Sequence, residues 1–140
     1  MEMYQPSPYD RIQAEEYKLI RDIASIESCV IVGRAADYIL SDKSHVSIFL
    51  FAPMEDRVKR KMALLKPEDA AKMTPAAMEK IVKQMDKQRK RYYEYYTDMK
   101  WGARDSYDLL INTSQSGIDG AVKIIRTYID ECRGESIMPD

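Results

Sequence analysis

The chain has 140 residues, a formal net charge of -1 and 32% charged residues of both signs. This length suffices for one domain with a hydrophobic core, and the charge gives no electrostatic case for binding nucleic acid or a membrane surface. No apolar run is long enough to cross a bilayer, so we expect a soluble, cytoplasmic protein without a nucleic-acid or membrane partner. The only histidine is His45, which argues against a histidine-rich metal site and predicts no bound metal.

The first expected helix begins at Ser7, a typical N-cap residue, with Pro8 at the first helical position and Asp10 facing the positive end of the dipole. It is expected to end near Glu27. Apolar residues recur along it at helical spacing, namely Ile12, Leu19, Ile20 and Ile23. The pattern predicts an amphipathic helix that precedes the first strand.

Two short apolar runs follow, residues 29–32 (CVIV) and residues 46–52 (VSIFLFA). Short runs without alternation are typical of parallel strands that are buried on both faces. Buried helical segments are the alternative, but the length, the β-branched residues and the stops at Gly33 and Pro53 favour strands. Cys29 would then be a buried, reduced thiol with a structural role.

The first run leads through Gly33 and Arg34 into a helical pattern over residues 35–40. Free backbone N–H groups, the helix dipole and a forked guanidinium at such a junction favour an anion site. An ordinary strand-to-helix turn is the alternative, and the junction alone does not decide between the two.

A further helix is expected after Pro53, with an apolar stripe formed by Met54, Val58, Met62 and Leu65. Its basic residues, which include Arg57, form either a solvated face or part of a binding surface. Residues 66–73 are polar, and Pro67 is expected to break the helical pattern there.

The next helix is expected to start at Thr74 and Pro75 and to end at Gly102, with a stripe formed by Ile81, Met85, Tyr92 and Tyr96. Asp86 and Arg89 lie one turn apart and can pair. The arginines and aromatic residues of segment 86–102 could stack nucleic-acid bases. Packing of the tyrosines on the domain is the simpler interpretation, and the near-neutral charge also argues against nucleic acid.

The last strand is expected over residues 107–112 (YDLLIN), followed by a polar loop over residues 113–117. Ser116 and Asp119 resemble a capping box and open a closing helix with an apolar face formed by Ile118, Val122, Ile125 and Ile129. Residues 133–140 are expected to form a flexible tail. This order of elements predicts an α/β fold, in which ligands gather beyond the carboxyl ends of parallel strands.

Four segments resemble one known family in their order and spacing: CVIVGRAADYIL, SIFLFAPMEDRVKR, MDKQRKRYYEYYTDMKWG and YDLLINTSQSGIDGAV. They resemble the cytidylate kinase-like proteins, which are P-loop kinases of the nucleoside monophosphate kinase type. The resemblance covers roughly residues 21–129. It implies a single kinase-like domain over 1–140, with a three-layer, parallel-sheet α/β fold and a helical lid over residues 74–102. It also implies that ATP with Mg²⁺ phosphorylates a nucleoside monophosphate such as CMP.

The same resemblance implies roles for individual residues. The candidate substrate-binding residues are Gly33, Arg34, Asp37, Arg57 and Asp86. The candidate catalytic residues are Arg89 and Arg91 of the lid, and the candidate loop near the donor base is Asn112, Thr113 and Ser114. Arginine suits phosphoryl transfer because it is always charged and binds bidentately. Ala35 stands where cytidylate kinases usually carry Asp, and Asp37 is the nearest acid.

The sequence contains no G-x-x-x-x-G-K-[ST] motif, whose backbone amides and lysine hold the donor phosphates in P-loop kinases. We therefore expect a chain that is truncated at its N-terminus and does not transfer phosphate from ATP to CMP by itself. A non-catalytic nucleotide-binding or regulatory module is the alternative.

In the family that this chain resembles, the strand that leads into the P-loop lies in the sheet between the strands that match residues 29–32 and residues 46–52. We expect this chain to lack that central strand. We expect three parallel strands that close up or accept a strand from another chain, with a tendency to form dimers or aggregates through the exposed edges. Arg34, Arg89 and Arg91 are expected to converge on one anion-sized pocket.

Overall fold

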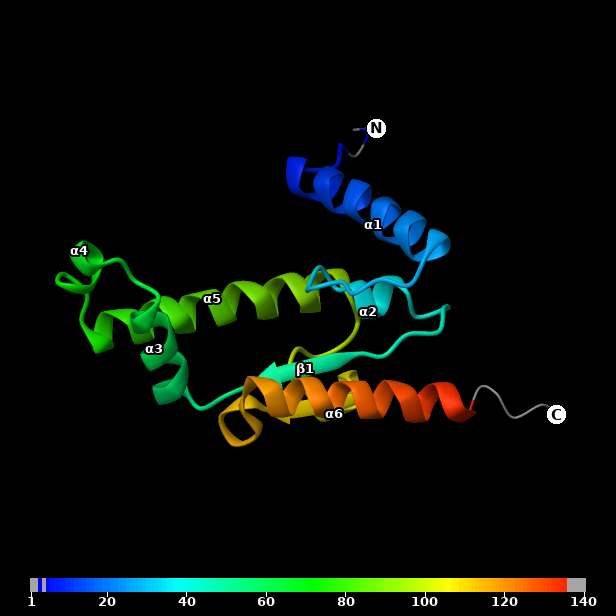
Figure 1. The fold of residues 1–140 in the computed structure, drawn as a ribbon. Helices are drawn as coiled ribbons and strands as arrows, with labels where there is room; N and C mark the ends of the chain where they lie inside the picture. Colours follow the sequence, from blue (N-terminus) through cyan, green and yellow to red (C-terminus); the bar gives the residue numbers. More distant parts are fainter. Residues whose placement is uncertain (1–2, 4, 136–140) are drawn as a thin grey trace.

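Two parallel strands and six α-helices make up the part of the chain that the computed structural model describes, which is residues 3 and 5–135. The helices are α1 (Pro8–Ile26), α2 (Ala36–Ile39), α3 (Met54–Ala63), α4 (Pro67–Ala70), α5 (Pro75–Tyr96) and α6 (Thr113–Glu135). The strands are β1 (Ile48–Phe51) and β2 (Leu109–Asn112), and the 3-10 helix η1 (Arg104–Ser106) precedes β2. In the view of Figure 1, α5 runs above the sheet and α6 below it.

The sheet pairs β1 with β2 in parallel, with Ile48 opposite Leu109 and Phe51 opposite Asn112. The second and third apolar runs therefore form parallel strands, as predicted, although β1 is shorter than residues 46–52. Leu50 and Phe51 are 53% and 44% exposed, so burial of this strand on both faces was a wrong prediction. Within the described residues no strand lies on the other edge of β1.

Residues 29–32 do not form a strand, which corrects the predicted three-stranded sheet. They run as an irregular segment between α1 and α2, with Val30 94% and Val32 89% exposed. Cys29 is an exposed free thiol rather than a buried one. The physical reason is that β-branched residues favour a strand only when a neighbouring strand pairs with their backbone, and the described part of the chain places none beside them. Association of copies through these edges stays a prediction.

The starts of α1 and α5 follow local sequence signals, as predicted. Ser7 Oγ accepts a hydrogen bond from the Asp10 backbone N–H, and the Asp10 carboxylate accepts one from Ser7 N–H in return, which completes a capping box. Thr74 Oγ1 accepts a hydrogen bond from Ala77 N–H and caps α5. The helical pattern breaks before Pro67, as predicted, since α3 ends at Ala63, and Pro67 opens the short α4 because proline fits the first helical position.

The main core lies between α3 and α5. Val58, Met78 and Val82 are buried there, and the partly buried residues around them are Met54, Met62, Leu65 and Met73. This confirms the predicted stripe of α3. The stripe of α5 is displaced by one position, because Ile81 is 44% exposed while its neighbour Val82 is buried. A second, smaller core joins α1 to α2 through Ile20, Ala36, Ile39 and Leu40.

Two helix ends differ from the prediction. Helix α5 ends at Tyr96, where Thr97 N–H donates a hydrogen bond to the Tyr93 carbonyl, so Gly102 does not end it. Gly102 instead has a left-handed φ of 73° in the following turn, where an added Cβ would lie 3.3 Å from the Phe49 ring.

At the other end of the sheet, residues 113–116 are helical rather than a loop, and Gly117 (φ 66°, ψ 175°) interrupts α6. Ser116 Oγ donates to the Gly117 carbonyl instead of capping through Asp119. Helix α6 includes residues 133–135 of the predicted tail, and residues 136–140 lie outside the described residues.

Candidate functional site

The turn that carries Arg34 has an unusual backbone. Gly33, Arg34 and Ala35 have φ values of 73°, 58° and 53°, all in the left-handed region. A residue other than glycine costs roughly 1–2 kcal/mol in this conformation, and such strain is concentrated at functional sites. Helix α2, which follows, has only 4 residues, so the predicted dipole contribution at this junction is small and the guanidinium is the main positive group.

Arg34 lines a cavity of about 160 Å³ between α1 and α5. Its guanidinium lies 5.6 Å above the ring centre of Tyr92, and its Nε is 3.7 Å from Glu16 Oε1, with the Arg34 side chain still 59% exposed. The full lining consists of Tyr9, Ile12, Gln13, Glu16, Arg34, Tyr92 and Tyr96. An exposed cation over an aromatic ring, beside a small cavity, is suited to hold an anionic group.

Two tyrosine hydroxyl groups of α5 donate hydrogen bonds to carboxylates of α1 around this cavity. Tyr92 Oη donates to Glu16 Oε2 at 3.2 Å, and Tyr96 Oη donates to Asp10 Oδ1 at 3.1 Å. Burial first, and then the Glu16 carboxylate, raise the pKa of the Tyr92 hydroxyl. Burial and Asp10 likewise raise the pKa of Tyr96 to about 12. Both phenols therefore stay protonated donors at neutral pH.

Asp37 lies away from this cavity and ties α2 to two other elements. Its carboxylate accepts hydrogen bonds from Tyr93 Oη at 2.8 Å and from Ser47 Oγ at 3.2 Å. Burial and the Asp37 carboxylate raise the pKa of the Tyr93 hydroxyl. The carboxylate thus has a structural use in joining α2, α5 and the residue before β1, and its predicted part in substrate binding stays a prediction.

Arg57 of α3 and Asp86 of α5 form a bidentate ion pair between the two helices. Arg57 Nη1 and Nη2 each donate to one Asp86 oxygen at 2.7 Å, and Arg89 Nη1 adds a longer bond of 3.3 Å. The hydrogen bonds from Arg57 hold the pKa of Asp86 below its ordinary value, and those to Asp86 raise the pKa of Arg57. The predicted Asp86–Arg89 pair is confirmed, but Arg57 is the stronger partner.

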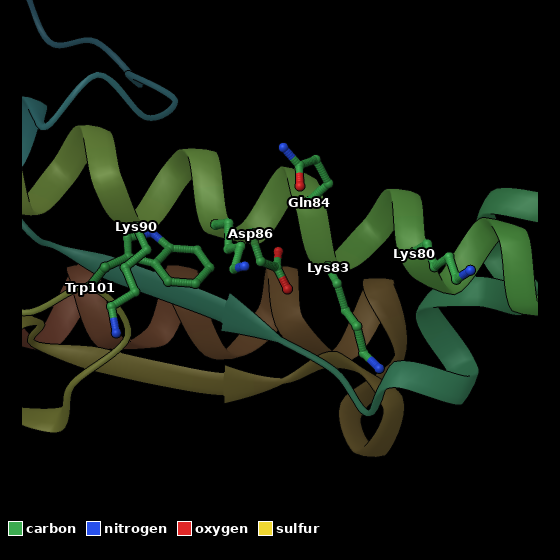
Figure 2. Close-up of a pocket in the computed structure, with 7 residues that line it drawn as sticks. Lys80, Lys83, Gln84, Asp86, Lys90 and Trp101 are labelled. Carbon is green, nitrogen blue, oxygen red and sulfur yellow. The ribbon is translucent and has the colours of Figure 1, made fainter.

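A larger cavity of about 540 Å³ runs along α5 and is shown in Figure 2. Its lining consists of Lys80, Lys83, Gln84, Asp86, Lys87, Lys90 and Trp101. Arg89 and Arg91 line neither this cavity nor the one at Arg34. Because they are two positions apart on a helix, they point in different directions. The structure therefore does not bring Arg34, Arg89 and Arg91 together in either of these two cavities.

The carboxyl ends of the two strands are joined by the first turn of α6. Thr113 Oγ1 donates to the Phe51 carbonyl at 3.3 Å, and Ser114 N–H donates to Asn112 Oδ1 at 3.1 Å. The Ser114 hydroxyl is buried and has no hydrogen-bond partner among the described residues. The role of Asn112, Thr113 and Ser114 near a donor base stays a prediction.

Comparison with known proteins shows which family this chain belongs to. The model of the cytidylate kinase-like family matches residues 2–115. The chain belongs to the cytidylate kinase-like family. Every candidate site residue predicted from the sequence, from Gly33 to Ser114, falls inside the matched range.

Individual relatives of this cytidylate kinase-like chain agree with the family. A cytidylate kinase of Thermococcus kodakarensis is 34% identical over 113 residues, which are 79% of this chain and 54% of that protein. A cytidylate kinase of Methanocaldococcus jannaschii is 30% identical, over 80% of this chain and 61% of that protein. The chain thus spans between about half and three fifths of the length of these relatives.

A solved structure shares the fold of this cytidylate kinase-like chain. It is an uncharacterized protein from Eubacterium ventriosum, with a TM-score of 0.78 and 33% sequence identity over 89% of this chain and 68% of that one. Within the described residues no helix of the cytidylate kinase-like chain is long and apolar enough to cross a membrane.

Sequence reasoning missed two groups around these cavities. The lysines of α5 that line the larger cavity were not among the predicted site residues, although their spacing of three and four residues places them on one helix face. Glu16 was not among the predicted site residues, because nothing local to residue 16 indicates that Arg34 and Tyr92 pack against it.

Proposed function

We propose that this chain is the acceptor-binding part of a cytidylate kinase-like phosphotransferase with a three-layer, P-loop-kinase-like fold. The observation that carries the proposal is Arg34, an exposed guanidinium on a strained turn, above Tyr92 and beside a cavity. In this proposal Arg34 binds the phosphate of a nucleoside monophosphate such as CMP, through charge-assisted hydrogen bonds. Gly33 lets the backbone turn at that point with a positive φ of 73°.

The remaining candidate residues take supporting roles. The Arg57–Asp86 pair holds α3 against the helical lid, which comprises residues 74–102. Arg89 and Arg91 lie on that lid and would meet the transferred phosphoryl group when the lid moves, because a positive charge there offsets the charge spread over the phosphoryl oxygens. Asn112, Thr113 and Ser114 would line the donor base at the carboxyl end of β2.

The family implies ATP and Mg²⁺ as donor and metal. Among the described residues no group of three His, Cys, Asp or Glu side chains could hold a metal ion, so we propose no magnesium ligand among them. The 140 residues also contain no P-loop motif, which supports a chain that binds the acceptor nucleotide without transferring phosphate by itself.

The decisive experiment compares CMP binding to the chain and to Arg34→Ala by calorimetry. One charged hydrogen-bonding group contributes about 1.5–3 kcal/mol, so the variant is expected to bind CMP roughly 10- to 150-fold more weakly. Arg104→Ala is the matched control, because Arg104 is exposed and lines neither cavity. No CMP binding by the unaltered chain at millimolar concentration, or equal affinities for the two variants, would refute the proposal.

Glu16→Gln tests the same cavity by removing a negative charge, where Arg34→Ala removes a positive one. Glu16 is an internal anion beside Arg34, so a bound phosphate must compete with it. Exposed ion pairs contribute about 0.2–1 kcal/mol, and neutralising Glu16 is therefore expected to tighten CMP binding roughly 1.5- to 5-fold. The pKa of Tyr92 should also fall toward its ordinary value, because Glu16 helps to raise it.

Ultraviolet titration of the tyrosines reports the second effect, and calorimetry reports the first. Glu15→Gln is the control, because it removes the same charge from the neighbouring position and Glu15 does not line the cavity. Weaker CMP binding in Glu16→Gln would show that the carboxylate helps to hold the ligand instead of competing with it.

A further inference from the structure

A buried phenol of α5 contacts the segment that carries Arg34. Tyr93 is 5% exposed, and its Oη donates a hydrogen bond to Asp37 Oδ2 at 2.8 Å. The other acceptor near this hydroxyl is Met99 Sδ at 3.6 Å, and a thioether is a weak acceptor, so the carboxylate is the main partner. Asp37 lies in the first turn of α2, directly after the turn of residues 33–35. The hydroxyl of Tyr93 therefore holds the segment on which the guanidinium is mounted.

The Asp37 carboxylate is already occupied by groups of the protein. Its Oδ2 accepts hydrogen bonds from Tyr93 Oη and Ser47 Oγ, at 2.8 and 3.2 Å, and its Oδ1 accepts one from the Tyr38 backbone N–H at 2.9 Å. An ionised carboxylate accepts about four hydrogen bonds, so little capacity is left for a ligand. Asp37 also lines neither cavity. These contacts favour a positioning role for Asp37 over the predicted direct contact with substrate.

Two consecutive residues of α5 hold the turn from different sides. The Tyr92 ring lies 5.6 Å from the Arg34 guanidinium, and the Tyr93 hydroxyl reaches Asp37. Successive residues of a helix are about 100° apart around its axis, so these two contacts restrain the turn in two directions. Helix α2 has only 4 residues and is too short to be stable by itself. Figure 1 shows it beside the C-terminal end of α5, and contacts with that end set its orientation.

The same hydrogen bonds connect the turn to the sheet. Ser47 is 8% exposed, and its carbonyl accepts a hydrogen bond from Leu109 N–H at 3.2 Å, at the start of β2. The Tyr93 ring stacks on the ring of Tyr107, with the ring centres 6.0 Å apart. Both side chains that donate to Asp37 Oδ2 are therefore fixed by the fold around them.

Strain in the turn makes such support necessary. Arg34 and Ala35 have positive φ values of 58° and 53°, which residues other than glycine rarely adopt. A strained backbone persists only where the surrounding structure over-determines it. Ala35 and Ala36, which are 6% and 8% exposed, contribute packing, and Asp37 contributes hydrogen bonds to two other elements.

We propose that Tyr93 is a positioning residue of the acceptor site. Through Asp37 it keeps the strained turn in the conformation that places the Arg34 guanidinium over Tyr92, where an anionic group can bind. Tyr93 lines neither cavity, so it acts through Arg34 and not by contact with the ligand. The effect on nucleotide binding rests on the proposed function, whereas the effect on the position of Arg34 rests on the hydrogen bonds alone.

Tyr93→Phe tests this role, because it removes the hydroxyl and retains the ring that stacks on Tyr107. The first measurement is the NMR spectrum of the full chain without ligand. The Arg34 side-chain protons lie near the Tyr92 ring and carry its ring-current shift, and comparison with Arg34→Ala identifies their signals. One hydrogen bond changes a local equilibrium roughly 3- to 10-fold. The fraction of molecules with Arg34 in place, and with it the shift, should fall by about this factor.

The second measurement is CMP binding by calorimetry. Affinity scales with the fraction of binding-competent molecules, so Tyr93→Phe is expected to bind CMP roughly 3- to 10-fold more weakly. Tyr95→Phe is the matched control, because it removes a hydroxyl from the same helix at a position that is 69% exposed and outside both cavities. It should leave the shift and the affinity unchanged. Ser47→Ala removes the longer hydrogen bond to Asp37 Oδ2 and should change both quantities in the same direction by a smaller factor.

The assignment is overturned if the ring-current shift of Arg34 is the same in Tyr93→Phe as in the unaltered chain, whatever the CMP affinity. It is also overturned if the shift shrinks while Tyr93→Phe and Tyr95→Phe bind CMP equally well. An unaltered chain that fails to bind CMP refutes the proposed function, and the ring-current shift then decides by itself whether Tyr93 positions Arg34. Circular dichroism confirms folding, and Ser47→Ala supplies the same two comparisons if Tyr93→Phe does not fold.

Discussion

Met78→Ala is expected to lower the free energy of unfolding by about 2–5 kcal/mol, which is the usual cost of truncating a buried methionine. Met78 is 4% exposed and packs with Val58 and Val82 between α3 and α5. These helices contain the main core of the described residues, so the truncation leaves a cavity in the part of the structure that buries most apolar surface. The measurement is urea unfolding followed by circular dichroism.

The matched control for this prediction is Ile81→Ala on the same helix. Ile81 is 44% exposed, so its truncation removes much less buried surface and should cost well under half as much. Equal losses in the two variants would contradict the structure, because they would mean that Ile81 faces the core as the sequence pattern alone suggested.

The second large effect is expected from Asp86→Ala. It removes both short hydrogen bonds from Arg57 and leaves a half-buried guanidinium without its partner. A lost hydrogen bond to a charged group costs about 1.5–3 kcal/mol, and the loss should appear in the free energy of unfolding. A double-mutant cycle with Arg57→Ala isolates the pair, since two partners in contact do not contribute additively.

The control for Asp86→Ala is Glu55→Gln, which breaks the exposed pair between Glu55 and Lys59. Its expected cost is at most about 1 kcal/mol. A coupling energy near zero between Arg57 and Asp86 would show that solvent already screens the bidentate pair.

The Arg57–Asp86 pair also makes the free energy of unfolding depend on pH. Because the folded-state pKa of Asp86 is lower than its unfolded value near 3.8, the stabilisation is fully present above that value. It is lost as the pH falls below it toward the folded pKa. Asp86→Asn should therefore flatten the loss of stability in this acidic window, and the part that remains includes Asp42, whose pKa Arg21 lowers to about 2.

How far the sequence predicted this fold depended on whether the signal was local. Ser7 and Thr74 cap their helices as expected, because a cap involves residues only three positions away. Residues 29–32 and β1 are both short, wholly apolar segments, yet only β1 is a strand. The difference lies in β2, a partner that is distant in the sequence and supplies the pairing to one segment and not to the other.

The candidate site likewise has features that the local sequence predicted and features that only the structure shows. Arg34 was found from its place after a glycine, and the structure adds what the sequence does not encode locally, namely the left-handed backbone and the contacts with Glu16 and Tyr92. Arg89 and Arg91 were named by family resemblance alone, and their catalytic role stays a prediction. The larger cavity along α5 depends on how this helix lies beside Trp101, which no local sequence signal indicates.

The parallel pairing of β1 with β2 also constrains the order in which the chain folds. Ser47 and Asp108, which are hydrogen-bonded beside the sheet, are 61 residues apart in sequence, and closing so long a loop costs entropy before any contact repays it. Helices α3 and α5 are much nearer to each other along the chain and share a core of their own. The helical pair should therefore form early and the sheet late, so that the strand ends assemble beside two helices that are already packed together.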